Sequence, residues 1–296
     1  MKVTNKHGVP ETLMALAQRQ FYSKGKSDYS VTEIISPPRI QRLRAMNYEQ
    51  MEQDVSDMLW SLLGSALHVV AERSEVEGYV NEERLYTNVD DVILSGQIDL
   101  QRIDGNYVDI IDYKFTSAWS LRQDKEDWIQ QQNIYGWLVN KEKNLIPRSL
   151  KICALIRDWA RREAQRNPDY PQAPIQLVDI PLWDLSHTEL FVRGRVDEHR
   201  NAKVAADWQE TLPECTDEER WVRETKYAVM KKERKTAVKL FDNEQEASEF
   251  LKALDDKHYL EIRNGEPIRC VNNFCGVNQW CSQFKRYTEE TNNVGA

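Results

Sequence analysis

Apolar residues recur at steps of three and four from Tyr48 to Glu72, which is the spacing of one face of an α-helix. The same period returns from Asp127 to Asn140, and again from Ser186 to about Trp208. We therefore predict three long helices. Gly64 lies in the middle of the first, where it costs about 1 kcal/mol relative to Ala, so we expect close packing against it.

Between the first two helices the pattern changes to the two-residue alternation of β-strands, from Glu83 to Phe115. Asp104-Gly105 interrupts this stretch and is a strong hairpin turn signal. Two more strands are predicted, from Leu150 to Trp159 and from Ile175 to Trp183. The order of these elements predicts a mixed α/β fold, with a central sheet flanked by helices.

No Gly/Ser-rich or Pro-rich linker divides the chain, so we take domain boundaries from changes of pattern. We predict an N-terminal helical segment over residues 1–47 and an α/β core over residues 48–210. Residues 211–296 then form an accessory region with a basic strand pair, one helix and a cysteine-rich end.

Composition and charge narrow the range of possible functions. No apolar run approaches the roughly 20 residues of a membrane-spanning helix, and the first 20 residues lack the apolar core of a secretory signal. We therefore expect a cytoplasmic protein that does not enter membranes. The formal charge of −8 excludes a histone-like coating protein. An enzyme with an acidic metal-binding centre and a local basic groove remains open.

The predicted hairpin brings acidic side chains together. A two-residue loop at Asp104-Gly105 places Asp99 diagonally across from Asp112, at a Cα separation of roughly 7–8 Å. Lys114, two residues beyond Asp112, points to the same side of the sheet. Two carboxylates at this spacing can share Mg²⁺ or Mn²⁺, which prefer oxygen ligands and assist phosphodiester hydrolysis.

Four short motifs follow one another in the chain: Gly64-x3-His68, Gly96-Gln97-Ile98-Asp99, Asp112-Tyr113-Lys114 and Gln131-x3-Tyr135. Their order, spacing and predicted elements resemble the RecB-type branch of the PD-(D/E)XK nuclease superfamily. The resemblance implies that His68, Asp99, Asp112 and the main-chain carbonyl of Tyr113 hold the metals. It also implies a catalytic role for Asp99, Asp112 and Lys114, and that Gln131 and Tyr135 contact DNA or brace the site.

Among members of that family, the chain is most similar to free-standing recombination exonucleases of phages and bacteria. The resemblance implies a PD-(D/E)XK core that acts on single- or double-stranded DNA in recombination, repair or phage DNA metabolism. Possible partners are a recombination single-strand annealing protein or further copies of the chain. Alternatives are a non-catalytic nucleic-acid-binding subunit or an adaptor on the same fold. Glu83 is either a carboxylate that supports the site or a surface charge.

Cysteines cluster near the end of the chain. Cys270, Cys275 and Cys281 lie within twelve residues, and Cys215 is a possible fourth member. Clustered thiols suggest zinc or an iron–sulfur cluster, and unligated thiols are the third alternative. Some RecB-like nucleases carry a [4Fe–4S] cluster whose fourth cysteine precedes the His motif. This chain has no cysteine before Cys153, so Cys215 would have to replace it.

Basic residues gather in the accessory region. Seven lysines and arginines lie between Arg223 and Lys239, with only two acidic residues among them. Trp221 and Tyr227 lie within or beside this stretch. It is either a solvated face or a groove that follows DNA phosphates while aromatic rings stack on bases.

Overall fold

A computed structural model describes residues 1–18, 24–122 and 125–294 of the chain. Contacts within the chain divide it into two compact units. The first unit comprises Met1–Pro38 and Asn47–Glu210, and the second comprises Arg39–Met46 and Thr211–Ala296. The predicted N-terminal segment 1–47 is therefore shared between the units, while the predicted boundary at residue 210 coincides with theirs. The three-part division itself stays a prediction.

A six-stranded mixed sheet forms the centre of the first unit. β5 pairs in parallel with β2 and antiparallel with both β4 and β6, and β7 pairs in parallel with β6 and antiparallel with β8. The strands are β2 (Tyr29–Ser30), β4 (Tyr79–Val89), β5 (Val92–Asp104), β6 (Tyr107–Thr116), β7 (Ile146–Ile156) and β8 (Ile175–Ile180).

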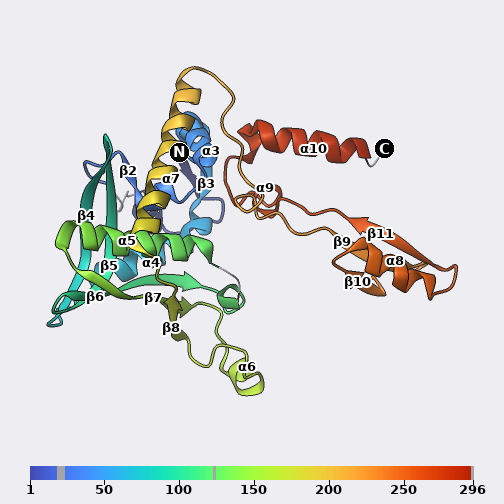
Figure 1. The fold of residues 1–296 in the computed structure, drawn as a ribbon, viewed down its shortest axis with the longest axis horizontal. Helices are drawn as coiled ribbons and strands as arrows, with labels where there is room; N and C mark the ends of the chain where they lie inside the picture. The colour runs from blue at the N-terminus through green and yellow to red at the C-terminus, as the bar shows by residue number, and fades with distance from the viewer. Residues whose placement is uncertain (19–23, 123–124, 295–296) are drawn as a thin grey trace. The chain divides into compact units, whose positions relative to one another are not determined.

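Helices flank this sheet, as the sequence predicts. α5 (Glu126–Lys143) lies across its strands (Figure 1), and α7 (Leu185–Asp207) and α2 (Val31–Ile34) pack in the same core. Ten residues of α5 are buried, including Ile134 and Leu138, which meet sheet residues such as Ile98 and Ile152. The remaining helices and short strands of the first unit are β1 (Lys2–Thr4), α1 (Glu11–Gln18), β3 (Glu52–Asp54), α4 (Leu59–Ala71) and α6 (Arg161–Arg166).

The prediction of one helix from Tyr48 to Glu72 is wrong in its first half. Residues Glu52–Asp54 form β3, which pairs in parallel with β1, and only Leu59–Ala71 are α-helical. The Asp54 carboxylate accepts hydrogen bonds from Thr4 Oγ1, from the Lys6 amide and from Ser56. These bonds satisfy backbone donors outside a helix, so local side-chain chemistry outweighs the apolar period.

The predicted hairpin is present with a different register. Asp104 pairs with Tyr107, so the two-residue loop is Gly105-Asn106 rather than Asp104-Gly105. Gly105 has a φ of +58°, which a residue without a Cβ adopts at little cost. The glycine therefore occupies the first loop position, and each residue of β6 lies opposite a β5 residue two places further along than predicted.

The second unit contains a three-stranded antiparallel sheet with the order β10-β9-β11. Its strands are β9 (Lys226–Lys231), β10 (Lys239–Phe241) and β11 (His258–Arg263), and α8 (Glu244–Lys252) packs on them through Ala247 (Figure 1). The unit also contains α3 (Pro38–Asn47, of which Arg39–Met46 belong to it), α9 (Ile268–Val271) and α10 (Ser282–Val294). Among all described helices, none has both the length and the apolarity needed to cross a membrane.

Candidate active site

The hairpin holds two of the predicted acidic residues. The last pair of the β5–β6 ladder is Leu100 with Ile111, so one further step places Asp99 opposite Asp112. This corrects the predicted diagonal arrangement, because the loop has shifted by one residue. The Tyr113 backbone N–H donates a hydrogen bond of 2.8 Å to Asp99 Oδ2. The predicted role of the Tyr113 carbonyl as a metal ligand stays a prediction.

A third carboxylate, Glu82, lies in the same row of side chains. The β4–β5 ladder pairs Asn81 with Leu100 and Glu83 with Ile98, a register that places Glu82 opposite Asp99. Side chains of residues opposite one another project from the same face of a sheet. Glu82 has a φ of +51°, which is uncommon for a residue other than glycine and marks local backbone strain.

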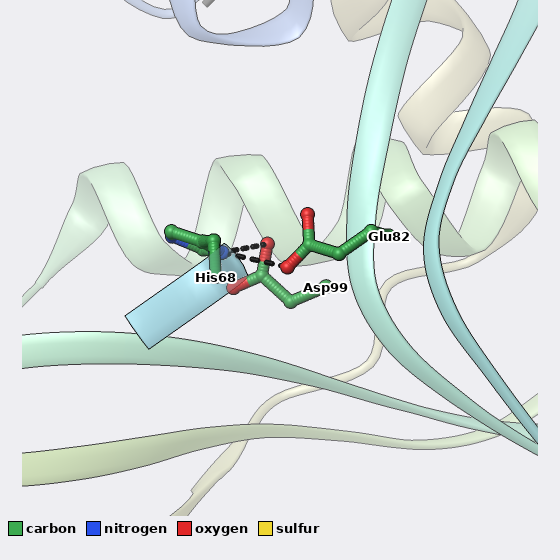
Figure 2. A group of neighbouring side chains, drawn as sticks. All are labelled: His68, Glu82 and Asp99. Atoms are coloured by element: carbon green, nitrogen blue, oxygen red, sulfur yellow. Dashed lines mark hydrogen bonds and ion pairs between the residues drawn. The ribbon is translucent and has the colours of Figure 1, made fainter. Parts of the chain in front are cut away.

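His68 of α4 completes the group (Figure 2). Its Nδ1 lies 2.8 Å from Glu82 Oε1 and 3.6 Å from Asp99 Oδ1. Donor atoms of His68, Glu82 and Asp99 all lie within 4.8 Å of one another, the only such group of three or more within the described part of the chain. One imidazole and two carboxylates at this spacing can ligate a single divalent cation.

Glu82 lies outside the four sequence motifs, and only its neighbour Glu83 was considered as a carboxylate that supports the site. Glu83 forms an ion pair with Lys143 at 2.6 Å and accepts a hydrogen bond from Gln101. A signal for Glu82 was present in Asp90-Asp91, which form the two-residue turn between Val89 and Val92. Counting back along both strands from that turn places Glu82 opposite Asp99.

Asp112, only 1% exposed, lies at the centre of a polar network. Lys114 Nζ is 2.8 Å from its Oδ2, and Gln131 Nε2 donates to its Oδ1 at 3.2 Å. Gln131 also donates to the Tyr135 hydroxyl at 2.9 Å. Gln131 and Tyr135, one helical turn apart on α5, are 5% and 4% exposed. This arrangement is suited to bracing Asp112, and contact with DNA by either residue stays a prediction.

One cavity of about 320 Å³ in the first unit is lined by the side chains of the site, namely His68, Glu82, Asp99, Asp112, Lys114, Gln131 and Tyr135. The structure thus brings together the predicted residues His68, Asp99, Asp112, Lys114, Gln131 and Tyr135, and adds Glu82. Gly96 of β5 lies directly under α5, because a Cβ there would be 2.6 Å from Leu138 Cδ1 and 2.9 Å from Tyr135 Cε1. The predicted close packing at Gly64 is wrong, since a Cβ at Gly64 would meet nothing within 4 Å.

Burial and neighbouring charges shift the protonation equilibria of the site. Desolvation, followed by the Asp112 charge, raises the pKa of Asp99 to about 7. The hydrogen bond to Glu82 raises the pKa of His68. Burial opposes the charge on Lys114, but the neighbouring carboxylates, led by Asp112, outweigh it and raise the pKa of Lys114. Lys114 is therefore a protonated ammonium group at neutral pH in the protein without metal.

Four of the five cysteines line a second cavity, which lies wholly within the second unit. These are the predicted residues Cys215, Cys270, Cys275 and Cys281. No three of their sulfur atoms lie within 4.8 Å of one another. Burial is the main cause that raises the pKa of the Cys215 thiol to about 12 and that of Cys270 to about 11.

A family model of the PD-(D/E)XK nuclease superfamily matches residues 7–282, and the chain belongs to this superfamily. Its fold is that of a nuclease acting on nucleic acid. The crystal structure of SSO0001 is similar at 15% identity and a TM-score of 0.44, covering 64% of this chain and 86% of the other. A "putative exonuclease" from Eubacterium rectale is similar at 11% identity and a TM-score of 0.31, covering 53% of this chain and 57% of the other. No curated protein sequence matches the chain.

Proposed function

We propose that this chain is a DNA exonuclease that requires Mg²⁺ or Mn²⁺. The observation that carries the proposal is the row of Glu82, Asp99 and Asp112 across three strands, with His68 and Lys114 in the same cavity. Similarity of the four sequence motifs to free-standing recombination exonucleases supports the exonuclease assignment. The same similarity supports a place in recombination, repair or phage DNA metabolism.

The chemistry of the site fits a divalent cation. Three carboxylates with largely buried side chains line the cavity, and repulsion between Asp99 and Asp112 contributes to the raised pKa of Asp99. A cation there would offset this repulsion and replace the proton. His68, Glu82, Asp99 and Asp112 are the residues that would hold it. When bound, a divalent cation activates water and stabilises the charge that develops on the phosphodiester.

Lys114 and Gln131 place a positive charge in the site and orient the Asp112 carboxylate. The Lys114 ammonium, next to Asp112, is placed to neutralise negative charge on the phosphate in the transition state. Gln131 fixes one oxygen of Asp112 and Lys114 the other, so the carboxylate has one orientation before substrate arrives. The intact set of acidic residues and lysine favours this proposal over a non-catalytic DNA-binding subunit or an adaptor.

Thiol chemistry supports a second cofactor, and we infer that Cys215, Cys270, Cys275 and Cys281 bind a [4Fe–4S] cluster. Their cavity contains four potential thiolate ligands, which suits a soft metal centre. Similarity to RecB-like nucleases that carry a [4Fe–4S] cluster favours the cluster, and tetrahedral zinc, with Zn–S bonds of about 2.3 Å, is the alternative.

Substrate and setting complete the proposal. We propose single- or double-stranded DNA as the substrate, and a recombination single-strand annealing protein or a further copy of the chain as a partner. The cytoplasm of a bacterium or of a phage-infected cell is the proposed location. Each of these rests on the motif resemblance.

The nuclease proposal is tested with end-labelled linear DNA and covalently closed circular DNA, each incubated with Mg²⁺, Mn²⁺ or EDTA. We expect cleavage of linear DNA only with the metals, and circular DNA should stay intact. Lys114→Ala should abolish cleavage and leave DNA binding near normal, because its charge acts mainly in the transition state. Lys151→Ala is the matched control, since Lys151 lies on the neighbouring strand with the same side-chain exposure of 30%. Undiminished cleavage by Lys114→Ala would exclude this site.

A further inference from the structure

Arg39 is a buried arginine at the beginning of α3, only 3% exposed and within the second unit. Its Nε–H donates to Cys281 Sγ at 3.2 Å, and its Nη2 donates to Ser282 Oγ at 2.6 Å. Its Nη1 donates to the carbonyl oxygens of Leu212 and Pro213 at 2.6 and 3.0 Å. Every nitrogen of the guanidinium group therefore has a partner, and one partner is a thiol sulfur.

No carboxylate within the described residues forms an ion pair with Arg39. A buried positive charge without a negative partner is costly, so such charges are normally paired. Arg39 and the four cysteines line the same cavity. The negative partner of Arg39 is therefore expected inside that cavity.

Two further arginines line the cavity, and both contain a buried nitrogen without a partner. The Nε atoms of Arg220 and Arg269 are buried and make no hydrogen bond. Glu219 is the one acidic residue among those that line the cavity, against three arginines. Basic side chains therefore outnumber acidic ones in the lining of the cavity, while Arg220 also forms an ion pair with Asp217.

We propose that Arg39 is a positioning residue for a negatively charged metal–thiolate centre, which it holds through its hydrogen bond to Cys281 and through its charge. The inference rests on the proposed cofactor. Four thiolates around a centre with two positive charges leave two negative charges in excess, whether the centre is a cluster or zinc. The arginines supply the compensating charge. N–H···S hydrogen bonds to ligand sulfurs also stabilise and tune such centres.

Geometry requires an arginine at this position. Cys281 and Ser282 belong to the cysteine-rich end, while Leu212 and Pro213 come from the segment just before Cys215. One rigid fork donates to all four acceptors, whereas a lysine ammonium has only three donors on a single nitrogen and cannot make all of these bonds. Arg39 thereby ties α3 to the two stretches of chain that carry the cysteines.

The test uses the full chain purified without oxygen. Iron, sulfide and zinc per chain, the visible absorption spectrum and the rate of metal release to a chelator are measured for the wild type, Arg39→Gln, Arg39→Lys and Arg42→Gln. Arg42 is the matched control because it lies on the same helix outside the cavity. Arg39→Gln should release the metal about 10–100-fold faster, as is typical when a residue supporting a metal ligand is removed. Arg42→Gln should match the wild type.

The measurements distinguish failure of the proposed cofactor from failure of the proposed role of Arg39. Wild-type protein without iron or zinc would overturn the proposed cofactor. Wild-type protein that contains a metal, with release from Arg39→Gln at the wild-type rate, would overturn the role of Arg39 alone. If Arg39→Gln does not fold, Arg39→Lys decides, because it keeps the charge and loses the fork. Release from Arg39→Lys faster than the wild type supports the inference, and release at the wild-type rate overturns it.

Discussion

Glu82 and Glu83 are adjacent in the chain, but their side chains contact different groups. Glu82 contacts His68 and accepts a hydrogen bond from Gln97, whereas Glu83 pairs with Lys143. Glu82→Gln removes a negative ligand, so we expect Mn²⁺ affinity to fall by about tenfold or more. Glu83→Gln, with the same change of charge, should leave affinity unchanged. Isothermal titration with Mn²⁺ measures both, and equal affinities for the two variants would remove Glu82 from the metal site.

The raised pKa of Asp99 predicts how stability depends on pH. Its pKa of about 7 in the folded protein exceeds the ordinary value of 3.8, so the folded state binds the proton more tightly than the unfolded state. This contribution to stability is complete below pH 3.8 and is lost as the pH rises through 7. The raised pKa of His68 acts in the same direction.

In EDTA, the melting temperature should therefore fall between pH 6 and pH 8. Saturating Mn²⁺ should reverse the fall at pH 8, because the metal binds the folded protein and takes the place of the proton. Asp99→Asn cannot ionise and should show a smaller decrease between the two pH values. Thermal unfolding followed by circular dichroism checks this. A melting temperature that rises with pH in EDTA would contradict the assigned shift.

The sequence predicted residue types at this site better than their exact placement. His68, Asp99, Asp112 and Lys114 meet because their motifs fix which elements carry them. Glu82 lies outside the four motifs, and its position depends on the β4–β5 register and on an unusual backbone conformation. A one-residue error in a turn changes every cross-strand pair, and so the Asp99–Asp112 relation was predicted as diagonal instead of opposite.

At the scale of elements, two glycines allow a matched comparison. Gly96→Ala would place a Cβ against Leu138 and Tyr135, and would push α5 away from β5. We expect a loss of about 1–3 kcal/mol in unfolding free energy, and weaker activity because Tyr135 bonds to Gln131. Gly64→Ala has open space around it in α4 and should stabilise that helix by up to about 1 kcal/mol.

Urea unfolding and nuclease assays on the two alanine variants test this contrast.

The helix of Gly64 also shows the limit of reading apolar periods. Met51 and Val55 fit the helical spacing, yet Asp54 between them binds the N-terminal strand and starts a short 3₁₀ turn instead. A polar side chain that bonds a distant segment leaves no mark on local periodicity, so the sequence could not predict where α4 begins.

At the scale of the whole molecule, charge is distributed unevenly. The end of β9 and the turn that follows it carry Lys231, Lys232 and Lys235, all exposed and in no ion pair among the described residues. We expect this turn to contact DNA phosphates despite the net charge of −8. Reversing the three charges should flatten the dependence of log K on log[salt] by up to about 0.9 for each contact with duplex DNA.

Fluorescence anisotropy with duplex DNA between 50 and 200 mM salt, a range of about fourfold, measures this slope. Reversing Lys2, Lys6 and Lys203 changes the net charge equally and serves as the control, since these lysines pair with Glu52 and Asp207. An equal change of slope in both triple variants would show that only total charge matters and that the turn makes no particular contact.

Each compact unit is assembled from separate stretches of the chain, and this has a consequence for the order of synthesis. α3 leaves the ribosome before Asn47–Glu210, which takes on the order of ten seconds or more to translate. Arg39, Ile40 and Leu43 therefore lack Leu212, Cys281 and Ser282 as neighbours until these later residues have also been translated. The cysteine cavity can close only after Cys281 and Phe284 have been translated, so the proposed metal centre would assemble after that point. A chain that stops before Cys270 would lack Cys281 and Ser282, so Arg39 would keep only the Leu212 and Pro213 carbonyl oxygens as partners.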